Sequence, residues 1–468
     1  MNSSARPEIT NARSWSWKQK LVTTWVVSFF KFISGLTSSS VVPNLPSIAA
    51  DLDIPRGALS ILPLSAYFLG YSVGLLIIGS LSETFGRLAA LQASNIIFIV
   101  FNTACGFSQT KTQIIIARTL SGLGGAGPLC LGGGILNDCF TPEERTSMIT
   151  IYALPTQISP AIGPILGVLC EAYLGWRWTF WIVSIASVVL QCVCFLTVRE
   201  TYKPVLERRA NRRNQIQHGE RKKERWQFMA ALRDDFQAAS DRIGTDLARP
   251  FKMLATHPVV MVIALYNGVT YGIQNLVIAS FQNLWVSRYH QEEILASLNY
   301  ITLAVGCVCG AQAARPLNKW VYQRLKARDS TGQGRPEFRI PMIAVGSVLV
   351  PMSLLWYGWW AQNLAFPLLP DLGVLVFAAG TVIILNCTSL YLVDAYKHHS
   401  ASATGAVNVL RALSGFAFPL FSERLYSALG YGWGNTVLAG LSIALGWPLP
   451  FLLWQYGRRW RAGLAPDE

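Results

Sequence analysis

The segment RTLSGLGGAGPLCLGGGILNDCFTPEERTSMITIYALPTQISPAIGPILG (residues 118–167) decides the fold of this chain. Two apolar runs, each long enough to cross a bilayer, flank its short polar break NDCFTPEERT. The first run begins with Arg118 among glycines. Because a guanidinium inside a membrane-spanning helix is costly unless it faces a cavity or a partner, we interpret Arg118 as a functional residue.

The second run contains the pattern PAIGPILG (residues 160–167). Proline removes a backbone donor from a helix and clashes with the preceding turn, and glycine leaves no side chain to stiffen the bend. We therefore expect Pro160, Gly163, Pro164 and Gly167 to form a kink or pivot. The alternative is that glycine and proline are simply commoner in membrane helices than in soluble ones.

The composition excludes an ordinary soluble enzyme. Of 468 residues, 52% are hydrophobic and only 14% are charged, whereas about a quarter of the residues in an average soluble protein are charged. The net charge of +14 does not indicate nucleic-acid binding, because the basic residues fall in the gaps between apolar segments. The nine cysteines form no C-x-x-C pair and no metal-like spacing, so we expect no metal site.

Twelve apolar stretches reach the length of about 17 to 25 residues that a spanning helix needs. Basic residues precede the first stretch and follow the even-numbered ones, which predicts that both termini are cytoplasmic. Residues 1–20 are polar, so we expect no cleavable signal peptide. The expected parts are a cytoplasmic tail (1–20), a six-helix half (21–198), a basic cytoplasmic linker (199–255), a second six-helix half (256–456) and a cytoplasmic tail (457–468).

In the linker, apolar residues recur at helical spacing between charged ones. This pattern predicts an amphipathic helix on the cytoplasmic membrane surface, and a solvated linker is the alternative. Two six-helix halves joined in this way place a substrate site near the bilayer midplane, at the interface of the halves.

Three motifs in order resemble those of the major facilitator superfamily. GSLSETFGR (residues 79–87) is similar to that superfamily's loop motif between helices two and three. Arg118 with its glycine-rich run resembles the fourth-helix motif, and PAIGPILG resembles the fifth-helix antiporter motif. The resemblance covers nearly the whole chain and is closest to the fungal twelve-span drug:proton antiporters, through ETYKPVL (200–206) and FPLF (418–421).

The resemblance implies an all-α integral membrane protein, with twelve transmembrane helices in two halves related by pseudo-two-fold symmetry. It also implies a secondary active exporter of amphipathic organic compounds, such as drugs or a fungal secondary metabolite. Export would proceed by rocker-switch alternating access, with the proton gradient as energy source and no cofactor. The membrane is expected to be the cell membrane, with a vacuolar or vesicular membrane as the alternative.

In the loop motif, Gly79 and Gly86 permit tight turns and close helix contact. Glu83, where the family usually has aspartate, can accept hydrogen bonds from a helix N-terminus.

Arg87 offers a bidentate donor, and we expect Asp138 at the end of span four to be its partner, with Arg145 as a competing partner. These pairs would hold the cytoplasmic side closed in the outward-facing state. An ordinary structural salt bridge is the alternative.

Polar side chains inside the apolar stretches are candidates for a wet cavity wall, because residues three and four apart share one helix face. Interhelical hydrogen bonding is the alternative for each of them. The candidate coupling and cavity residues are Arg118, Gln157, Glu171, Asn267, Tyr271, Gln274, Asn275, Asn386, Asn408 and Arg411. We expect Lys31 instead to extend to the cytoplasmic interface.

The identity of the protonated group stays open at this stage. Glu171, Asp138, a residue of the second half or the substrate itself could carry the proton. A positive charge at Arg118 could shift the pKa of a nearby acid or exchange partners with an anionic substrate group.

Two other functions remain possible for the same architecture: a proton-coupled importer or facilitator for a small nutrient, and a non-transporting membrane sensor. An enzyme is not expected, because the sequence contains no Walker loop, no dinucleotide fingerprint and no HExxH pattern. The expected partners are a small organic substrate, protons and the lipid bilayer, with no nucleic acid, and the expected oligomeric state is a monomer.

Overall fold

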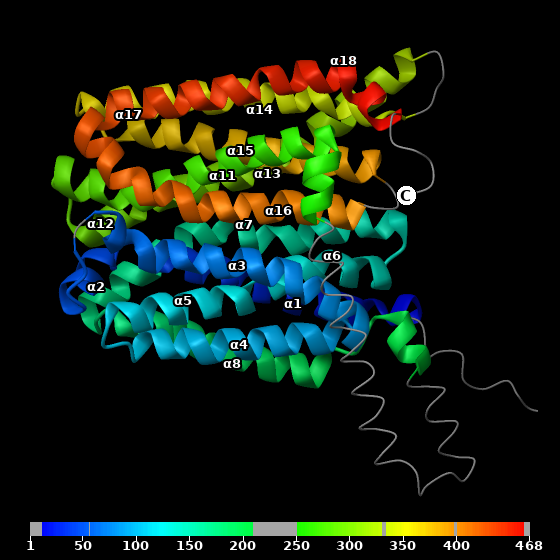
Figure 1. Ribbon diagram of the computed structural model, residues 1–468, viewed down its shortest axis with the longest axis horizontal. Coiled ribbons are helices and arrows are strands. Elements are labelled where there is room, and N and C mark those ends of the chain that lie inside the picture. The colour runs from blue at the N-terminus through cyan, green and yellow to red at the C-terminus, as the bar shows by residue number, and fades with distance from the viewer. Residues whose placement is uncertain (1–11, 56, 209–249, 330–333, 397–399, 463–468) are drawn as a thin grey trace, which may run out of the picture.

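The computed structural model describes residues 12–55, 57–208, 250–329, 334–396 and 400–462 (Figure 1). Helices make up its secondary structure, and these ranges contain no strand. The long helices run side by side along one direction, so the bundle has two ends (Figure 1). We call the end where α8 stops and α11 starts the linker end, and the opposite end the far end.

The first half of the bundle is built from six long helical segments and one short helix at the far end. These are α1 (Trp17–Ser40), α2 (Leu45–Asp51), α3 (Ala58–Phe85), α4 (Arg87–Gly106), α5 (Lys111–Gly125) continued by α6 (Gly127–Cys139), α7 (Pro142–Tyr173) and α8 (Arg177–Thr197). A single turn, η1 (Ala12–Ser14), precedes them.

The second half follows after the linker. Its elements are α11 (Pro258–Asn283) continued by the π-helical turn η2 (Leu284–Arg288), α12 (Glu293–Leu298), α13 (Tyr300–Arg328), η3 (Pro336–Arg339), α14 (Ile340–Gln362), α15 (Leu368–Ala395), α16 (Ser400–Ala417), η4 (Phe418–Phe421), α17 (Ser422–Gly446) and α18 (Pro448–Ala462). The predicted amphipathic helix falls mostly on residues 209–249, which lie outside the described residues.

In the described parts of the chain, eleven helical stretches are long and apolar enough to cross a membrane, and the last of them, Ser402–Trp460, has 59 residues. At Gly430 the backbone leaves the helical region, with φ 70° and ψ 179°. The glycine divides this stretch into two arms of close to 30 residues, each about 45 Å of helix. The oxygen Oε1 of Gln362 accepts hydrogen bonds from the N–H groups of Tyr431 (2.9 Å) and Gly432 (3.4 Å) at the start of the second arm. Counted in this way, the described residues contain the twelve predicted spans.

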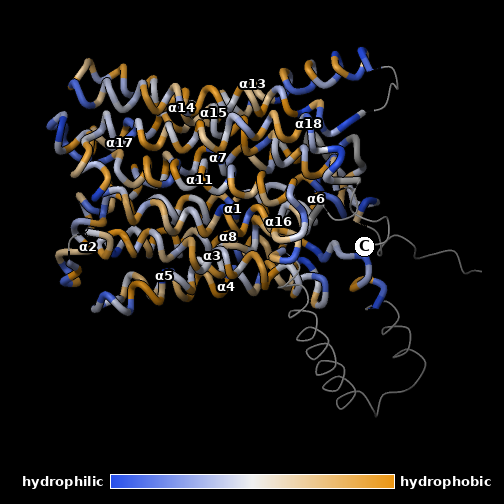
Figure 2. The backbone as a smooth tube through the Cα atoms, turned by 45° about the horizontal axis from the view of Figure 1, so that its top comes forward, coloured by the Kyte–Doolittle hydropathy of each residue, from blue (hydrophilic) through white to orange (hydrophobic). Residues whose placement is uncertain are grey.

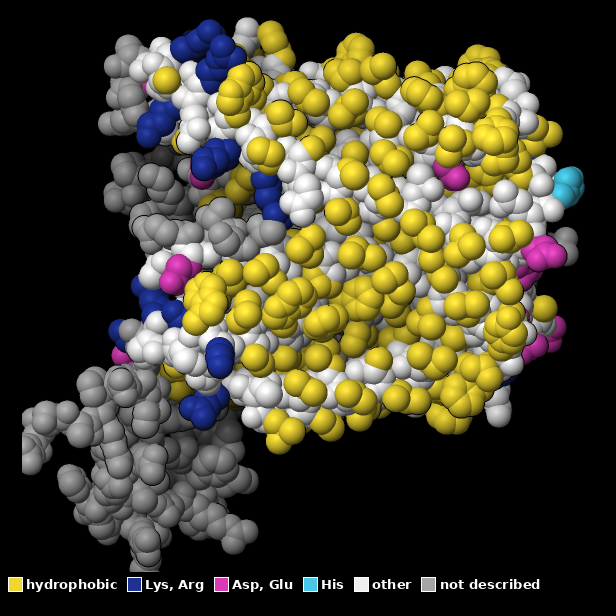
Figure 3. All heavy atoms as spheres, turned by 180° about the vertical axis from the view of Figure 1, so that it is seen from behind, with side chains coloured by type: hydrophobic (Ala, Val, Ile, Leu, Met, Phe, Trp, Pro, Cys, Tyr) yellow, Lys and Arg dark blue, Asp and Glu magenta, His cyan; other side chains and the backbone are white. Residues whose placement is uncertain are grey.

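The surface agrees with a bilayer around the middle of the bundle. Apolar residues line the middle of the helices and polar residues lie toward both ends (Figure 2). On the face seen in Figure 3, hydrophobic side chains cover the breadth of the bundle, while Lys and Arg side chains gather at the linker end. Exposed apolar side chains such as Val189, Leu196 and Met352 are stable only against lipid or another apolar surface.

The two halves meet through α7 against α13 and α3 against α16. One apolar core joins far-end residues of the first half, such as Ile48 and Leu64, to residues of the second half, such as Ile273. The linker-end residues of the first half, such as Leu91 and Leu136, form a separate core with no member from the second half. Among the described residues, the apolar core that joins the halves therefore lies toward the far end.

Candidate functional site

A cavity of about 370 Å³ lies between the two halves, with a wall from each of them. The first half contributes side chains of α1, α3, α6 and α7, and the second half contributes side chains of α11, α13, α15 and α16. Hydroxyl, amide and phenol groups dominate its lining. They belong to Ser34, Ser38, Ser39, Tyr67, Tyr71, Thr156, Gln157, Ser159, Tyr271, Gln274, Asn275, Asn386, Ser389, Thr404 and Asn408.

Most of the predicted cavity residues line this space. They are Gln157, Tyr271, Gln274, Asn275, Asn386, Asn408 and Arg411, from three helices of the second half and one of the first. Their helical spacing brings them to one face of each helix, as the sequence predicted. Their contact with a substrate stays a prediction.

Arg118 does not line the cavity, which corrects the expectation that it points into a water-lined pocket. Its side chain is 0% exposed. The Nε atom donates to the carbonyl of Pro63 (2.8 Å), and the terminal nitrogens donate to the carbonyl of Thr37 (3.4 and 3.5 Å). The guanidinium lies 4.8 Å from the ring centroid of Tyr67 and 5.7 Å from that of Phe180. Arg118 therefore ties α5 to α1, α3 and α8 inside the first half, behind the cavity wall.

Two other predicted cavity residues also lie elsewhere. The amide of Asn267 exchanges hydrogen bonds with the hydroxyl of Thr388 (3.0 and 3.1 Å), which joins α11 to α15. For Asn267 the alternative of interhelical hydrogen bonding is the correct one. Glu171 lies in the last turn of α7 at the far end, away from the cavity lining.

Lys31 lines the cavity, although we expected it to extend to the membrane interface. Its ammonium nitrogen lies 4.4 Å from the ring centroid of Tyr152, whose hydroxyl donates to the carbonyl of Pro128 (2.7 Å). The aromatic face holds the ammonium inside the bundle, because the negative face of a ring attracts a cation. The serine-rich face of α1 that carries Ser34 and Ser38 was the signal in the sequence that could have placed Lys31 inward.

The carboxylates of the described residues are absent from the cavity lining, which contains two cations, Lys31 and Arg411. The guanidinium of Arg411 lies 4.9 Å from the ring centroid of Tyr271. Each cation therefore has an aromatic ring as its neighbour, although only Tyr271 of the two rings lines the cavity. The site combines positive charge, aromatic faces and neutral hydrogen-bonding groups.

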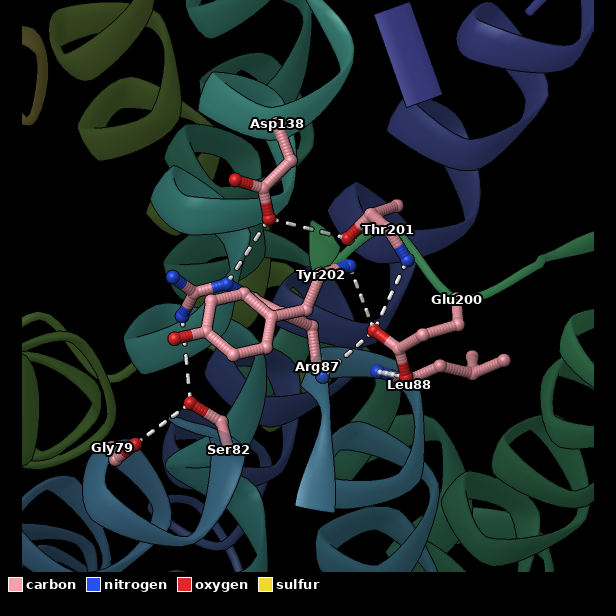
Figure 4. Close-up of polar contacts among 8 residues, drawn as sticks. All are labelled: Gly79, Ser82, Arg87, Leu88, Asp138, Glu200, Thr201 and Tyr202. Atoms are coloured by element: carbon pink, nitrogen blue, oxygen red, sulfur yellow. Dashed lines mark hydrogen bonds and ion pairs between the residues drawn. The ribbon is translucent and has the colours of Figure 1, made fainter. Parts of the chain in front are cut away.

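A second site lies at the linker end, where the predicted ion pair between Arg87 and Asp138 is present. Nε of Arg87 lies 3.3 Å from the carboxylate of Asp138, and a terminal nitrogen donates to Ser82 Oγ (3.4 Å) (Figure 4). The hydroxyl of Thr201 donates to the same carboxylate (3.4 Å), and the guanidinium lies 5.2 Å from the ring centroid of Tyr202. The pair thus joins α4, α6 and the segment after α8, all within the first half.

Glu200 has the role that we expected of Glu83, which is exposed. The Glu200 carboxylate accepts hydrogen bonds from the N–H groups of Arg87 (2.9 Å) and Leu88 (3.2 Å) at the N-terminus of α4 (Figure 4). An acidic side chain in this position satisfies free donors and complements the helix dipole. Gly86 turns the chain with φ 102°, and a Cβ there would lie 2.4 Å from the Glu200 carboxylate. Only glycine fits between these two groups.

The other candidates of the linker end have separate outcomes. Gly79 lies within α3 and not at a turn, which corrects that part of the prediction, and an added Cβ there would be 3.4 Å from the sulfur of Cys130 in α6. The side chain of Arg145 lies outside the described residues, so its competition with Arg87 stays a prediction. The gating role of the Arg87–Asp138 pair also stays a prediction.

The proline and glycine motif of α7 produces a close contact with α1. The helix continues through Pro160 and Pro164 without a break. The role of the motif as a pivot stays a prediction. A Cβ on Gly163 would lie 2.0 Å from Ser39 Oγ, and one on Gly167 would lie 2.2 Å from the carbonyl oxygen of Ser40. The glycines therefore let two helices approach at backbone distance, as small residues do in membrane helix pairs.

Curated relatives of similar length have been named as pumps and transporters. The chain is 37% identical over 452 residues to "Efflux pump vrtL" of Penicillium aethiopicum, which covers 97% of this chain and 88% of that protein. It is 34% identical over 457 residues to "MFS-type transporter oryF" of Aspergillus oryzae, covering 97% and 93% of the two chains.

Solved structures share the fold at low identity. The xylose transporter XylE from E. coli, in a partially occluded inward open conformation, superposes with a TM-score of 0.65 at 14% identity, over 93% of this chain and 99% of that one. A bacterial homologue of the human lysosomal transporter Spinster superposes with a TM-score of 0.66 at 12% identity, over 97% and 100% of the two chains. The family description "Major Facilitator Superfamily" matches residues 27–419. The chain belongs to the Major Facilitator Superfamily and is a multi-pass membrane transporter.

Proposed function

We propose that this transporter exports amphipathic organic compounds by proton antiport, through alternating access of the cavity between its two halves. The observation that carries the proposal is the cavity itself, which is polar and aromatic and lies where the halves meet. Its volume of about 370 Å³ falls in the range of roughly 300 to 1,000 Å³ that takes small organic ligands. The names of the curated relatives support the direction of transport.

The packing of the halves supports alternating access. The rings of Phe68 in α3 and Tyr271 in α11 meet across the halves, with centroids 6.1 Å apart. A Cβ on Gly415 of α16 would contact both rings, at 3.3 Å from Phe68 and 3.1 Å from Tyr271. This packing belongs to the apolar core that joins the halves. In the outward-facing state it would separate, while the linker ends of the halves approach one another.

The proton would bind a buried carboxylate outside the cavity. Asp371, in the first turn of α15 at the far end, is 9% exposed, and its Oδ1 atom has no hydrogen-bond partner among the described residues. A buried carboxylate without a cation is a natural proton acceptor, because protonation removes the uncompensated charge. Asp371 is thus a residue of the second half that could serve as carrier, in addition to Glu171 and Asp138. The proton gradient would be the sole energy source.

The linker end would face the cytoplasm. Lys and Arg side chains gather there on the visible face of Figure 3, as the positive-inside bias requires of a cytoplasmic surface. The described chain also starts and ends at this end of the bundle (Figure 1). The cell membrane is the proposed location, with a single chain as the functional unit.

A yeast strain that lacks its own drug exporters would test the function. We would express the chain and measure growth on a panel of toxic organic compounds, together with the intracellular level of each. Ser389→Trp would fill the cavity from α15, while the matched control Leu390→Trp places the same side chain on the exposed face of that helix. Membrane levels of both variants would be measured by immunoblot.

The expected result is resistance to several compounds, with lower accumulation, in cells with the wild-type chain or Leu390→Trp. Cells with Ser389→Trp should be as sensitive as cells without the chain. A protonophore should abolish export. Equal resistance with both variants would contradict transport through this cavity, and higher accumulation than in control cells would indicate an importer.

A further inference from the structure

We infer that the cavity selects organic anions, namely compounds in which an aromatic ring carries a carboxylate, sulfonate or ionised phenol. The inference rests on the proposed function and names the substrate class of the same site. It follows from the two cations of the cavity and from what surrounds them.

Lys31 brings its ammonium into the cavity from the first half. It lies midway along α1, and among the described residues no carboxylate lines the cavity beside it. The ring centroid of Tyr152 lies 4.4 Å from its ammonium nitrogen, in a cation–π contact. A cation–π contact compensates only part of the hydration that an ammonium loses on burial.

Arg411 brings a guanidinium into the same cavity from α16 in the second half. The ring of Tyr271 lies 4.9 Å from it, and the described residues offer it no carboxylate either. Arginine presents a planar set of donors that matches a carboxylate or sulfonate. Its neighbour Asn408, one turn earlier on α16, offers an amide to the same ligand group.

The two cations repel one another, because both are positive and line the same cavity. An anion that contacts both would offset this repulsion. It would also supply the negative charge that no carboxylate of the cavity lining supplies. A cationic ligand would increase the repulsion. The charge of the ligand should therefore decide its affinity more than its shape does.

Aromatic rings and amides supply the rest of the site. Phe68, Tyr67, Tyr71 and Tyr271 line the cavity, so a flat apolar ring can stack beside the charged group. An amphipathic anion fits this combination, whereas a small inorganic anion would leave the aromatic wall uncovered.

Three naphthalene probes of similar shape would test the inference, one anionic, one neutral and one cationic. They are 2-naphthalenesulfonate, 2-naphthalenesulfonamide and trimethyl(2-naphthyl)ammonium. Binding to the full chain in lipid nanodiscs would be followed through the shift of the thermal unfolding midpoint at increasing probe concentration. We expect the sulfonate to bind at least about tenfold more tightly than the sulfonamide and the ammonium probe to bind most weakly.

Two variants remove the positive charges and a third is a matched control. Lys31→Gln and Arg411→Gln should each weaken sulfonate binding by about tenfold or more, with little effect on the sulfonamide. Lys111→Gln makes the same change of net charge at an exposed position at the start of α5 and should bind like the wild type.

A preference for the neutral or the cationic probe, or no response to the sulfonate, would overturn the inference. So would a sulfonate preference that persists in both Lys31→Gln and Arg411→Gln. These failures are distinct from failure of the proposed function, because export in yeast of neutral or cationic compounds alone would leave the exporter standing and remove only its anion selectivity. If the chain neither exported any compound from yeast nor bound the sulfonate, both the proposed function and the anion selectivity would be contradicted.

Discussion

Lys31 in α1 and Arg411 in α16 line one cavity from opposite halves of the bundle. The described part of the cavity wall offers neither of them a carboxylate. Their positive charges are therefore stabilised by aromatic rings and by any anion that enters the cavity. Because the cations belong to different halves, a ligand that contacts both would also link the halves. If the cavity binds an anionic substrate as inferred, substrate charge and conformational change would be coupled at the same two side chains.

Replacement of Arg118 by alanine should lower stability as well as export. The change leaves the carbonyls of Pro63 and Thr37 without their buried donor and opens a void between Tyr67 and Phe180. We expect the free energy of unfolding to fall by about 3 kcal/mol. Arg324→Ala, at an exposed position of α13, should change it by less than about 0.5 kcal/mol.

Chemical denaturation in detergent micelles would measure both variants. If Arg118→Ala lost export at unchanged stability, the guanidinium would act on the substrate or the proton rather than in the packing described above.

The Arg87–Asp138 pair should contribute little to the free energy of unfolding and have a larger effect on the export rate. Both side chains are about one-fifth exposed, 19% and 20%, so a double-mutant cycle with Arg87→Ala and Asp138→Ala should give a coupling free energy of about 1 kcal/mol. If the pair gates transport, each single variant should lower the export rate several-fold at equal membrane level. Unchanged export in both would make the pair an ordinary structural salt bridge.

Gly167→Ala should impair folding and transport, while Gly133→Ala should not. The added methyl group at Gly167 would meet the backbone oxygen of Ser40 at 2.2 Å, and a backbone atom cannot rotate away. At Gly133 nothing lies within 4 Å. We expect a loss of about 1 to 3 kcal/mol for Gly167→Ala from overpacking. Membrane level and thermal unfolding would be compared, and equal values would show that the α1 and α7 contact is loose.

Acid should weaken one contact at the far end. The indole N–H of Trp176 (3.0 Å) and the guanidinium of Arg177 (2.8 Å) donate to the carboxylate of Asp51 and lower its pKa from the ordinary value of 3.8. The pKa of Asp51 is lower in the folded protein than in the unfolded chain. The contact therefore stabilises the folded protein fully above about pH 4, and this stabilisation is lost as the pH falls through the folded pKa.

Asp51→Asn should therefore destabilise the protein by less than about 1 kcal/mol at pH 6, since the site is half-exposed. The difference in unfolding midpoint from the wild type should shrink at pH 3. A difference that grows on acidification would contradict the direction of the pKa shift.

The spans and the two halves could be predicted because hydropathy and length decide which segments enter a membrane. The structure joins the C-terminal pair of predicted spans into one helical stretch, in which a single positive φ at Gly430 separates the two arms. Helical spacing likewise predicted part of the cavity wall, since Gln274 and Asn275 line the cavity together with Tyr271.

The errors concern direction and partners, which no local pattern contains. Lys31 and Arg118 are both cations in apolar helices, yet one lines the cavity and the other is wholly enclosed. Their positions depend on which neighbour supplies a ring or a carbonyl, and these come from helices far away in the chain. Glu200 replaces Glu83 as the cap of α4 for the same reason, since the segment after α8 returns to that helix end.

Flux in reconstituted vesicles tests the central claim most directly. We would load proteoliposomes with a compound that the chain exports from yeast, impose a pH gradient, and follow the compound across the membrane. The account predicts flux that requires the gradient, persists in Leu390→Trp and is absent in Ser389→Trp. Flux of equal rate in both variants, or flux indifferent to the gradient, would contradict proton-driven transport through the cavity between the halves.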